Sequence, residues 1–443
     1  MVKLFYVFII FIGICCLRFA FAHVQEPFFV LKDRFHKKFD SECSKYSFVK
    51  KFEDLARSPN GRYVVYKFSE DVPRRLDSGW GDKVAGLIQA AAMAVRFNRT
   101  LLIESSQQNS LYHFFGNYGS PHKSFAHTFP PHARKNVLHC TGNDKPERVI
   151  ACSMLNGDVP EEVIEFWGHR EYICRWELAI PQVMRDVFGV QQADDLNQVA
   201  GCLHRLAMWP TKHLWSKVQA LYADAHQHLH VSIPAGNETL RPRHDVLALG
   251  NKIHADKSNL MQIGVHFRCG QNSNYQDIAK CLSGPHTDAQ VKLRGTPLDL
   301  AQLVATIIQK QRVLANSYTN SLPIALISAD DSGVSAQISQ HLRQHNVSNI
   351  LVPDKGCQID FNASYACLEV TAVGWFMLSL SDALVVQREG PGLNYPPSGF
   401  SRSAAMYGLT LHPEAHAFHV FGLPGDTSLS TIDSRKQQKN WFC

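Results

Sequence analysis

The stretch YVVYKFSEDVPRRLDSGWGDKVAGLIQAAAMAVRFNRTLLI, residues 63–103, carries the first clear fold signal in the sequence. Residues 63–68 are mostly β-branched and aromatic, which favours a strand. Residues 83–97 repeat apolar side chains at helical spacing and predict a helix with one buried face. Residues 101–103 predict a second strand, so the unit is strand, glycine-rich turn (residues 79–82), helix and strand. The apolar residues of the helical face are Val84, Leu87, Ile88, Ala91 and Val95.

Beyond this unit the chain divides at a polar stretch, residues 234–257. Before it, residues 105–160 are rich in His, Pro, Asn and Ser and predict loops, whereas residues 161–222 show helical patterns. After it, short apolar segments alternate with helical ones, and this alternation predicts a parallel sheet covered by helices on both faces. The expected strands are residues 263–267, 324–328, 350–352 and 383–386, and the expected helices are residues 298–314, 334–344, 365–380 and 401–408. We therefore expect an α/β protein with two lobes facing each other across a cleft, residues 23–250 and 251–443.

The composition is that of a globular protein. The chain has 443 residues, of which 45% are hydrophobic and 19% are charged. A disordered chain is more polar than this. The formal net charge of +6 is spread along the sequence, so it does not predict a nucleic-acid partner.

The N-terminus predicts entry into the secretory pathway. Residues 4–17 carry no charge, lie between Lys3 and Arg18, and are followed by Ala20-Phe21-Ala22. This pattern predicts a signal peptide over residues 1–22. The alternative is a signal anchor that spans the membrane and would hold Arg18 within the bilayer. In either case we expect the protein in the lumen of the Golgi or endoplasmic reticulum, or secreted.

Cysteines and glycosylation motifs fit that compartment. Ten cysteines follow the leader and allow up to five disulfides, whose pairing the sequence does not reveal. These cysteines are Cys43, Cys140, Cys152, Cys174, Cys202, Cys269, Cys281, Cys357, Cys367 and Cys443. Four motifs for N-glycosylation begin at Asn98, Asn237, Asn346 and Asn362.

Polar side chains at the expected strand ends point to an anion site. His266 and Arg268 end one strand and, being two residues apart, project to the same side. Arginine binds phosphate oxygens through two parallel hydrogen bonds. Residues 398–401, Ser-Gly-Phe-Ser, open a helix whose hydroxyls, N–H groups and dipole also favour an anion. These features predict a diphosphate site that needs no metal, and the sequence contains no Asp-x-Asp pair. At a third strand end, Asp330 and Asp331 are equally explained as caps of the next helix.

Four segments, in this order, resemble the motifs of the fucosyltransferase superfamily, which includes the α1,6-, α1,2- and protein O-fucosyltransferases. They are residues 79–83 with 98–103, residues 263–268, residues 327–331 and residues 398–405. The resemblance implies a GT-B fold of two Rossmann-like lobes, with the acceptor on the first lobe and the donor on the second. It also implies GDP-fucose as donor, a glycan or glycoprotein hydroxyl as acceptor, inversion at the sugar carbon and no cofactor.

The same resemblance implies roles for single residues. Arg268 would neutralise the β-phosphate of the leaving GDP, with His266 beside it, and Asp382 would contact the guanine. Gly81 and Asp82 would lie near donor and acceptor. The phosphate–nucleoside region would be bound by the start of the last helix, at Ser398, Gly399, Phe400 and Ser401.

Two features leave alternatives open. The family often has an acidic residue where this chain has Gln271, and the carboxylate that accepts the acceptor's proton is either Asp277 or Asp82. A non-catalytic protein that binds glycans or nucleotide sugars is therefore one alternative. An NAD-dependent oxidoreductase is another, although Gly86 follows Gly81 by five residues rather than the three of the dinucleotide motif. A metal site at His226, His228 and His230 is not expected, because no acidic ligand lies nearby in the sequence.

Overall fold

The computed structural model describes most of the expected core of both lobes. The described ranges are residues 31–67, 79–104, 111–119, 137–141, 150–151, 159–167, 181–191, 193–231, 262–267, 297–298, 300–302, 304–305, 308, 324–329, 332–347, 349–353, 364–381, 383–387, 398–408 and 418–421.

The first sheet has five parallel strands in the order β2-β1-β6-β4-β5. Helix α3 (Trp80–Arg96) connects β1 to its neighbour β2, as predicted. Because the strands are parallel, α3 begins at the carboxyl edge of this sheet. The strands are β1 (Tyr63–Lys67), β2 (Thr100–Glu104), β4 (Val137–Thr141), β5 (Ile150–Ala151) and β6 (Val163–Trp167).

Three features of this lobe differ from the predictions. Strands β4 and β5 lie in the segment predicted as loops, and β6 lies in a segment predicted as helical. Strand β6 pairs with both β1 and β4, so its backbone hydrogen bonds depend on strands distant in sequence. A five-residue apolar run cannot be assigned from periodicity alone. Helix α3 also begins at Trp80 rather than residue 83, so Gly81 lies in its first turn and not in a preceding turn.

The second sheet is also parallel throughout, in the order β10-β9-β8-β11-β12. Numbered along the chain, this order is third, second, first, fourth, fifth, which is that of a Rossmann fold. The predicted strands of this lobe are confirmed, and β12 is an addition. The strands are β8 (Gln262–Phe267), β9 (Ile324–Ala329), β10 (Ile350–Leu351), β11 (Ala383–Gln387) and β12 (Phe418–Phe421). Three of the four predicted helices are confirmed as α12 (Ser332–Gln344), α13 (Tyr365–Ser379) and α14 (Gly399–Tyr407). The fourth, residues 298–314, is described only in part, at the helical residues 298, 300–302, 304–305 and 308. The fold class predicted from the sequence, an α/β protein with two Rossmann-like parallel sheets, is therefore confirmed.

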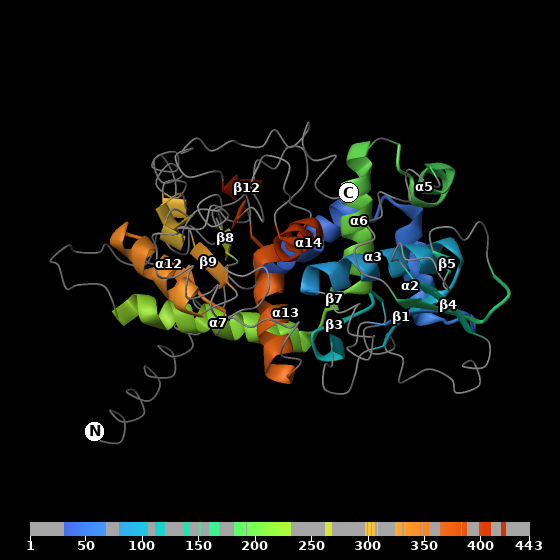
Figure 1. The fold of residues 1–443 in the computed structure, drawn as a ribbon, viewed down its shortest axis with the longest axis horizontal. Helices are drawn as coiled ribbons and strands as arrows, with labels where there is room; N and C mark the ends of the chain where they lie inside the picture. Colours follow the sequence, from blue (N-terminus) through green and yellow to red (C-terminus); the bar gives the residue numbers. More distant parts are fainter. Residues whose placement is uncertain are drawn as a thin grey trace, which may run out of the picture.

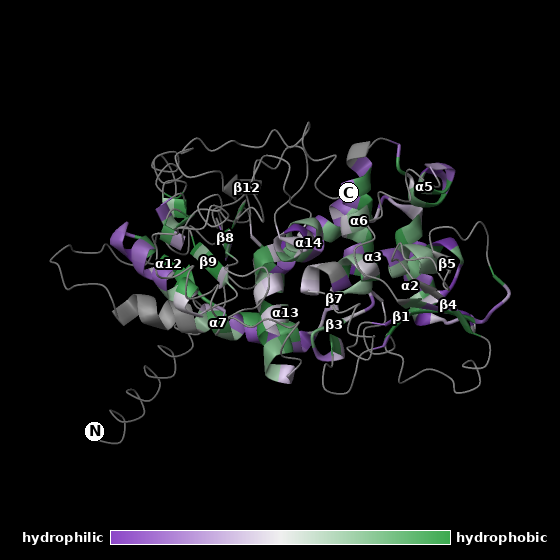
Figure 2. Cartoon of the chain, in the orientation of Figure 1, coloured by the Kyte–Doolittle hydropathy of each residue, from purple (hydrophilic) through white to green (hydrophobic). Residues whose placement is uncertain are grey.

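Helices cover both faces of the second sheet. One face packs on α12 and on the helical residues between 297 and 308, and Figure 2 shows the hydrophilic side of α12 turned away from β9. The other face packs on α13, which is apolar on all sides and buried along most of its length. A helix without a polar face belongs in a protein interior.

The remaining helices and strands complete the first lobe and its junction with the second. They are α2 (Ser47–Arg57), the 3₁₀ turn η2 (Leu111–His113), β3 (Phe115–Gly116), α5 (Pro181–Phe188), α6 (Ala193–Ala207), β7 (Trp209–Pro210) and α7 (Lys212–Val231).

The two sheets are joined by packed helices rather than by the polypeptide alone. Helix α14 packs on α3, α6 and α13, and Figure 1 shows α13 and α14 between the two sheets. One hydrophobic cluster contains side chains from α3, α6, α13 and both sheets. Helix α7 precedes residue 250, yet it packs on β10 and α13. The domain boundary at residue 250 remains a prediction.

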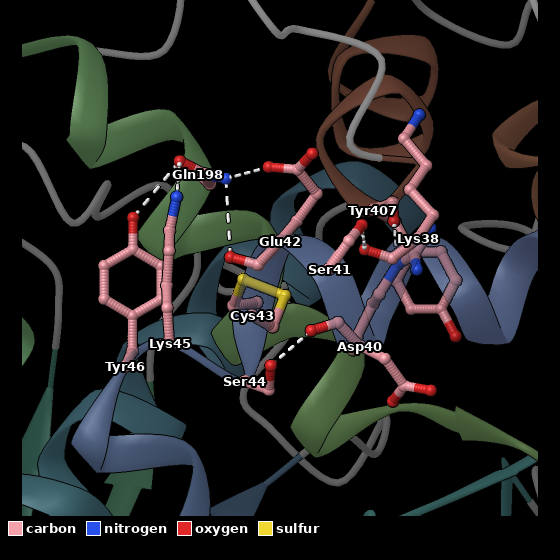
Figure 3. The surroundings of a disulfide bond; sticks show 12 residues. Lys38, Asp40, Ser41, Glu42, Cys43, Ser44, Lys45, Tyr46, Gln198 and Tyr407 are labelled. Carbon is pink, nitrogen blue, oxygen red and sulfur yellow. Dashed lines mark hydrogen bonds between the residues drawn. A yellow bond between two sulfur atoms is a disulfide. The ribbon is translucent and has the colours of Figure 1, made fainter.

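A disulfide between Cys43 and Cys202 links the helical residues 31–43 to α6. Around it the Gln198 side chain accepts hydrogen bonds from Tyr46 and Lys45, each 3.2 Å long, and donates to Glu42 (Figure 3). Cys367 is disulfide-bonded as well. The prediction that this chain contains disulfides is confirmed, whereas the predicted compartment is not tested by the structure.

The predicted leader, residues 1–22, lies outside the described residues, and so do the side chains of His226, His228 and His230. Within the described ranges, no helix combines the length and the apolar character needed to cross a bilayer.

Candidate active site

The first turns of α3 and α14 are in direct backbone contact. A β-carbon placed on Gly81 would lie 2.1 Å from the carbonyl carbon of Gly399 and 2.5 Å from the backbone nitrogen of Phe400. Glycine is required here because no side chain fits between the two helices. Each helix follows the carboxyl end of a strand, α3 after β1 and α14 after β11. The N-termini of two helices, one following a strand of each sheet, therefore meet at one point.

This point lies beside the place where ligands bind in open parallel sheets. In the second sheet the chain runs from β8 to β9 and β10 in one direction across the sheet. It then returns to β11 and β12 on the other side of β8, so the strand order reverses between β8 and β11. A crevice at the carboxyl ends of such strands is the usual ligand site. The partial positive charge of a helix N-terminus favours an anion there. The first turn of α14 carries no acidic side chain to neutralise that charge.

The hydroxyls at the start of α14 bond within the helix. Ser398 is the N-cap, and its Oγ accepts a hydrogen bond of 3.3 Å from the backbone N–H of Phe400. The hydroxyl of Ser401 donates to the carbonyl oxygen of Ser398 at 3.1 Å. Both side chains are buried. These two hydroxyls therefore shape the helix start, and an anion at this end would be met by backbone N–H groups.

His266 joins the same site from β8. Its ring stacks on that of Phe400, with the ring centres 5.0 Å apart and the planes 26° from parallel. His266 is buried. A β-carbon on Gly264, two residues earlier in the strand, would meet Leu378 of α13, so the side chain of His266 lies on the sheet face that α13 covers. The structure thus brings together three of the segments predicted to bind the donor. They contribute Gly81, His266, Ser398, Gly399, Phe400 and Ser401.

Helix α14 is held at its other end as well. Arg205 of α6 donates to the carbonyl oxygen of Tyr407 at 2.6 Å and to that of Phe35 at 3.0 Å. A β-carbon on Gly408 would lie 2.3 Å from the carbonyl oxygen of Ser379. A cation at a helix C-terminus offsets the negative end of the dipole. Contacts at both ends of α14 therefore fix the position of its N-terminus, the end that favours an anion.

Side-chain hydrogen bonds fix the rotation of α14 about its axis. The indole N–H of Trp375 in α13 donates to the hydroxyl of Ser403 at 2.9 Å. The Tyr407 hydroxyl donates to the carbonyl oxygen of Met208 at 2.6 Å. Trp375 in turn packs on Trp80, the residue before Gly81. The start of α3 and the start of α14 therefore belong to one packed unit.

Burial governs the ionisation of the groups behind the site. Burial lowers the pKa of Arg205 to about 10, which leaves the guanidinium charged at neutral pH. Burial, and to a lesser degree the charge of Arg205, holds the pKa of His204 well below its usual range. Neither ring nitrogen of His204 has a hydrogen-bond partner within the described structure. His204 is therefore neutral at physiological pH, packed between the rings of Trp375 and Tyr407.

Four predicted site residues cannot be placed. Arg268, Asp277 and Asp382 lie outside the described residues, and Asp82 is described only as part of the backbone of α3. Their roles remain predictions. Among the described side chains, no group of three or more His, Cys, Asp or Glu could hold a metal ion.

Sequence reasoning missed the residues that hold β8 in place. The amide of Gln262 donates to the carbonyl oxygen of Met377 at 3.0 Å and accepts from the hydroxyl of Tyr222 in α7. A β-carbon on Gly264 would lie 2.6 Å from the hydroxyl oxygen of Ser381. A glycine inside a strand indicates close approach of another segment, so Gly264 was detectable in the sequence. The partners of Gln262 were not, because Tyr222 and Met377 lie 40 and 115 residues away, in two different helices.

Comparison with known proteins gives structural matches only. No protein-family model matches the sequence, and no curated protein matches it. Among solved structures, NodZ α-1,6-fucosyltransferase co-crystallised with GDP matches at 13% identity with a TM-score of 0.39, over 82% of this chain and 96% of that one. Selenomethionine fucosyltransferase NodZ from Bradyrhizobium matches at 14% identity and a TM-score of 0.38, over 82% and 95% of the two chains. NodZ soaked with GDP-fucose matches at 13% identity and a TM-score of 0.37, over 78% and 92%. TM-scores below 0.5 do not establish a common fold, so the fold assigned above rests on strand order and register.

Proposed function

We propose that this chain is an inverting glycosyltransferase that transfers fucose from GDP-fucose to a hydroxyl of a glycan or glycoprotein. The observation that carries the proposal is the backbone contact between the first turns of α3 and α14 at the carboxyl edges of the two sheets. Such a junction suits a diphosphate, because two helix N-termini act on one anion. The ordered motifs in the sequence narrow the nucleotide sugar to GDP-fucose.

In the proposed reaction the acceptor oxygen attacks the anomeric carbon of fucose as the bond from that carbon to the β-phosphate oxygen breaks. The electron pair of that bond leaves with GDP, and the proton of the acceptor hydroxyl passes to Asp277 or Asp82. Charge grows on the leaving diphosphate, so fixed dipoles stabilise the transition state more than the ground state. Arg268 and the start of α14 are assigned to that charge, and the reaction is proposed to need no metal.

The place of the acceptor and of the protein follows from the same proposal. The acceptor is assigned to the first lobe, and Asp382 is assigned to the guanine. The protein is proposed to act in the lumen of the Golgi or endoplasmic reticulum, either after cleavage of its leader or anchored by it. Sensitivity of its glycans to endoglycosidase H would report that compartment.

Calorimetric titration of the purified protein with GDP tests the donor site. We expect GDP to bind, UDP and NAD to bind far more weakly, and Arg268→Ala to weaken GDP binding at least about tenfold, because a charged hydrogen bond is lost. Arg185→Ala is the matched control, since this exposed arginine lies on α5 outside the site. Absence of GDP binding would contradict the proposal.

An array of glycan and glycopeptide acceptors incubated with GDP-fucose tests the transfer itself. Product should form equally well in the presence of EDTA, and NMR of the product should show an inverted anomeric centre. GDP binding without transfer to any acceptor, and without slow hydrolysis of GDP-fucose, would instead favour the non-catalytic binding protein. Comparing Asp82→Asn with Asp277→Asn distinguishes the two candidate bases, because the loss of the base lowers kcat more than the affinity for GDP.

A further inference from the structure

Two histidines lie side by side where α12 ends, His341 in its last turn and His345 as the residue after it. His341 and His345 are four residues apart, so they lie on the same face of the helix. Their ring centres are 4.6 Å apart, and their Nε2 atoms are 3.1 Å apart. Both residues are partly exposed, so solvent reaches them.

The separation of the two nitrogens fits a single shared cation. Imidazole nitrogens bind Zn²⁺ at about 2.0–2.1 Å, so two of them at bond angles between 90° and tetrahedral are about 2.9–3.4 Å apart. The observed 3.1 Å lies within that range. The same distance allows one ring to donate a hydrogen bond to the other, and a bound cation would replace that shared proton. No movement of the helix is needed for either arrangement.

The surrounding structure fixes the pair and favours positive charge. The backbone N–H of His345 donates to the carbonyl oxygen of His341 at 3.2 Å, so the helical turn continues through both residues. The turn ends at Asn346, whose φ of 62° is left-handed. Ile338 and Leu342, on the adjoining face of the same helix, anchor it in the core. The pair thus sits at the C-terminus of a fixed helix, where the dipole attracts cations.

We propose that His341 and His345 form a two-histidine binding site for a divalent cation that prefers imidazole, namely Ni²⁺, Cu²⁺ or Zn²⁺. Imidazole nitrogens are suitable ligands for all three ions. Water completes the coordination, because no described cluster adds a third protein ligand. The site is separate from the junction of α3 and α14 and takes no part in the proposed transfer, so its test is independent of that function.

Calorimetric titration of the whole protein with Ni²⁺ tests the proposal. Free imidazole in the buffer suppresses binding at single histidines, which matters because the chain has 22 of them. The wild type should show one binding event that survives this competition. His341→Gln and His345→Gln should each weaken it by about 100-fold, because a second ligand on the same helix acts at high effective concentration. The double variant should be no weaker than either single one.

The matched control is His213→Gln, an exposed histidine in the first turn of α7. It should leave the event unchanged, and circular dichroism should show the same helix content in all four variants. Two results would overturn the proposal: Ni²⁺ binding that persists in both single variants, or losses that simply add in the double variant. Either would assign the metal to other histidines.

Discussion

Substituting Gly81 with alanine tests the contact on which the candidate site depends. The added β-carbon would lie 2.1 Å from the carbonyl carbon of Gly399, whereas ordinary contact begins at 3.4 Å. The obstructing atoms belong to the backbone, so no side-chain rotation relieves the overlap. The two helices must separate by about 1.3 Å or lose their regular geometry.

The cost of that separation can be set against the gain in helix propensity. Overpacking of this kind costs about 1–3 kcal/mol, and more where backbone must move. Alanine in place of glycine inside a helix returns about 1 kcal/mol. We therefore expect Gly81→Ala to lower the free energy of unfolding by about 2 kcal/mol. A displacement of about 1 Å at a reacting centre reduces turnover by about 100-fold. We therefore expect fucosyl transfer to fall by about this factor even in variant protein that is still folded.

The measurements are urea unfolding, GDP titration and fucosyl transfer, each on both variant and control. The matched control is Gly374→Ala within α13, where the new β-carbon meets its nearest neighbour, the Ser328 hydroxyl oxygen, at an ordinary 3.4 Å. That control should be as stable as the wild type or more so, and fully active. If Gly81→Ala behaves like Gly374→Ala in all three assays, the two helix starts do not touch as described and the reasoning is refuted.

Three further predictions concern the structure behind the site. Cys43→Ser should lower the free energy of unfolding by about 2–5 kcal/mol in chemical denaturation, because the bond to Cys202 closes a loop of 159 residues; equal stability of wild type and variant would show that the bond contributes nothing. His204→Phe should reduce the loss of stability in acid. The pKa of His204 is lowered in the folded protein, so below pH 6.5 the unfolded chain takes up a proton that the folded protein does not. The free energy of unfolding of the wild type should therefore fall by about 1.4 kcal/mol relative to the variant by pH 5.5. Parallel stability curves from pH 7 to 5 would contradict this. Arg205→Met leaves the carbonyl oxygen of Tyr407 without its donor, so it should destabilise the protein by about 1–3 kcal/mol and weaken GDP binding, whereas unchanged GDP affinity would separate Arg205 from the site.

Elements with a local pattern can be predicted from the amino-acid sequence. The helix predicted for residues 83–97, apart from its first turn, and four strands of the second lobe follow from the sequence, because apolar periodicity and β-branched runs reflect burial on one or two faces. The serine at position 398 was also recognised as the start of a helix, because its hydroxyl caps a backbone N–H only two residues away.

The arrangement of those elements in space is known only from the folded structure. Strand β6 and the strand order of both sheets depend on partners far away in sequence, which no local pattern encodes. The contact of Gly81 with Gly399 joins residues more than 300 positions apart, and glycine alone does not say which backbone approaches it. The pairing of Cys43 with Cys202 and the support of α14 by Arg205 are of the same kind. Long-range packing arises from the shape of the whole chain, so the position of the site becomes visible only once the two sheets are packed.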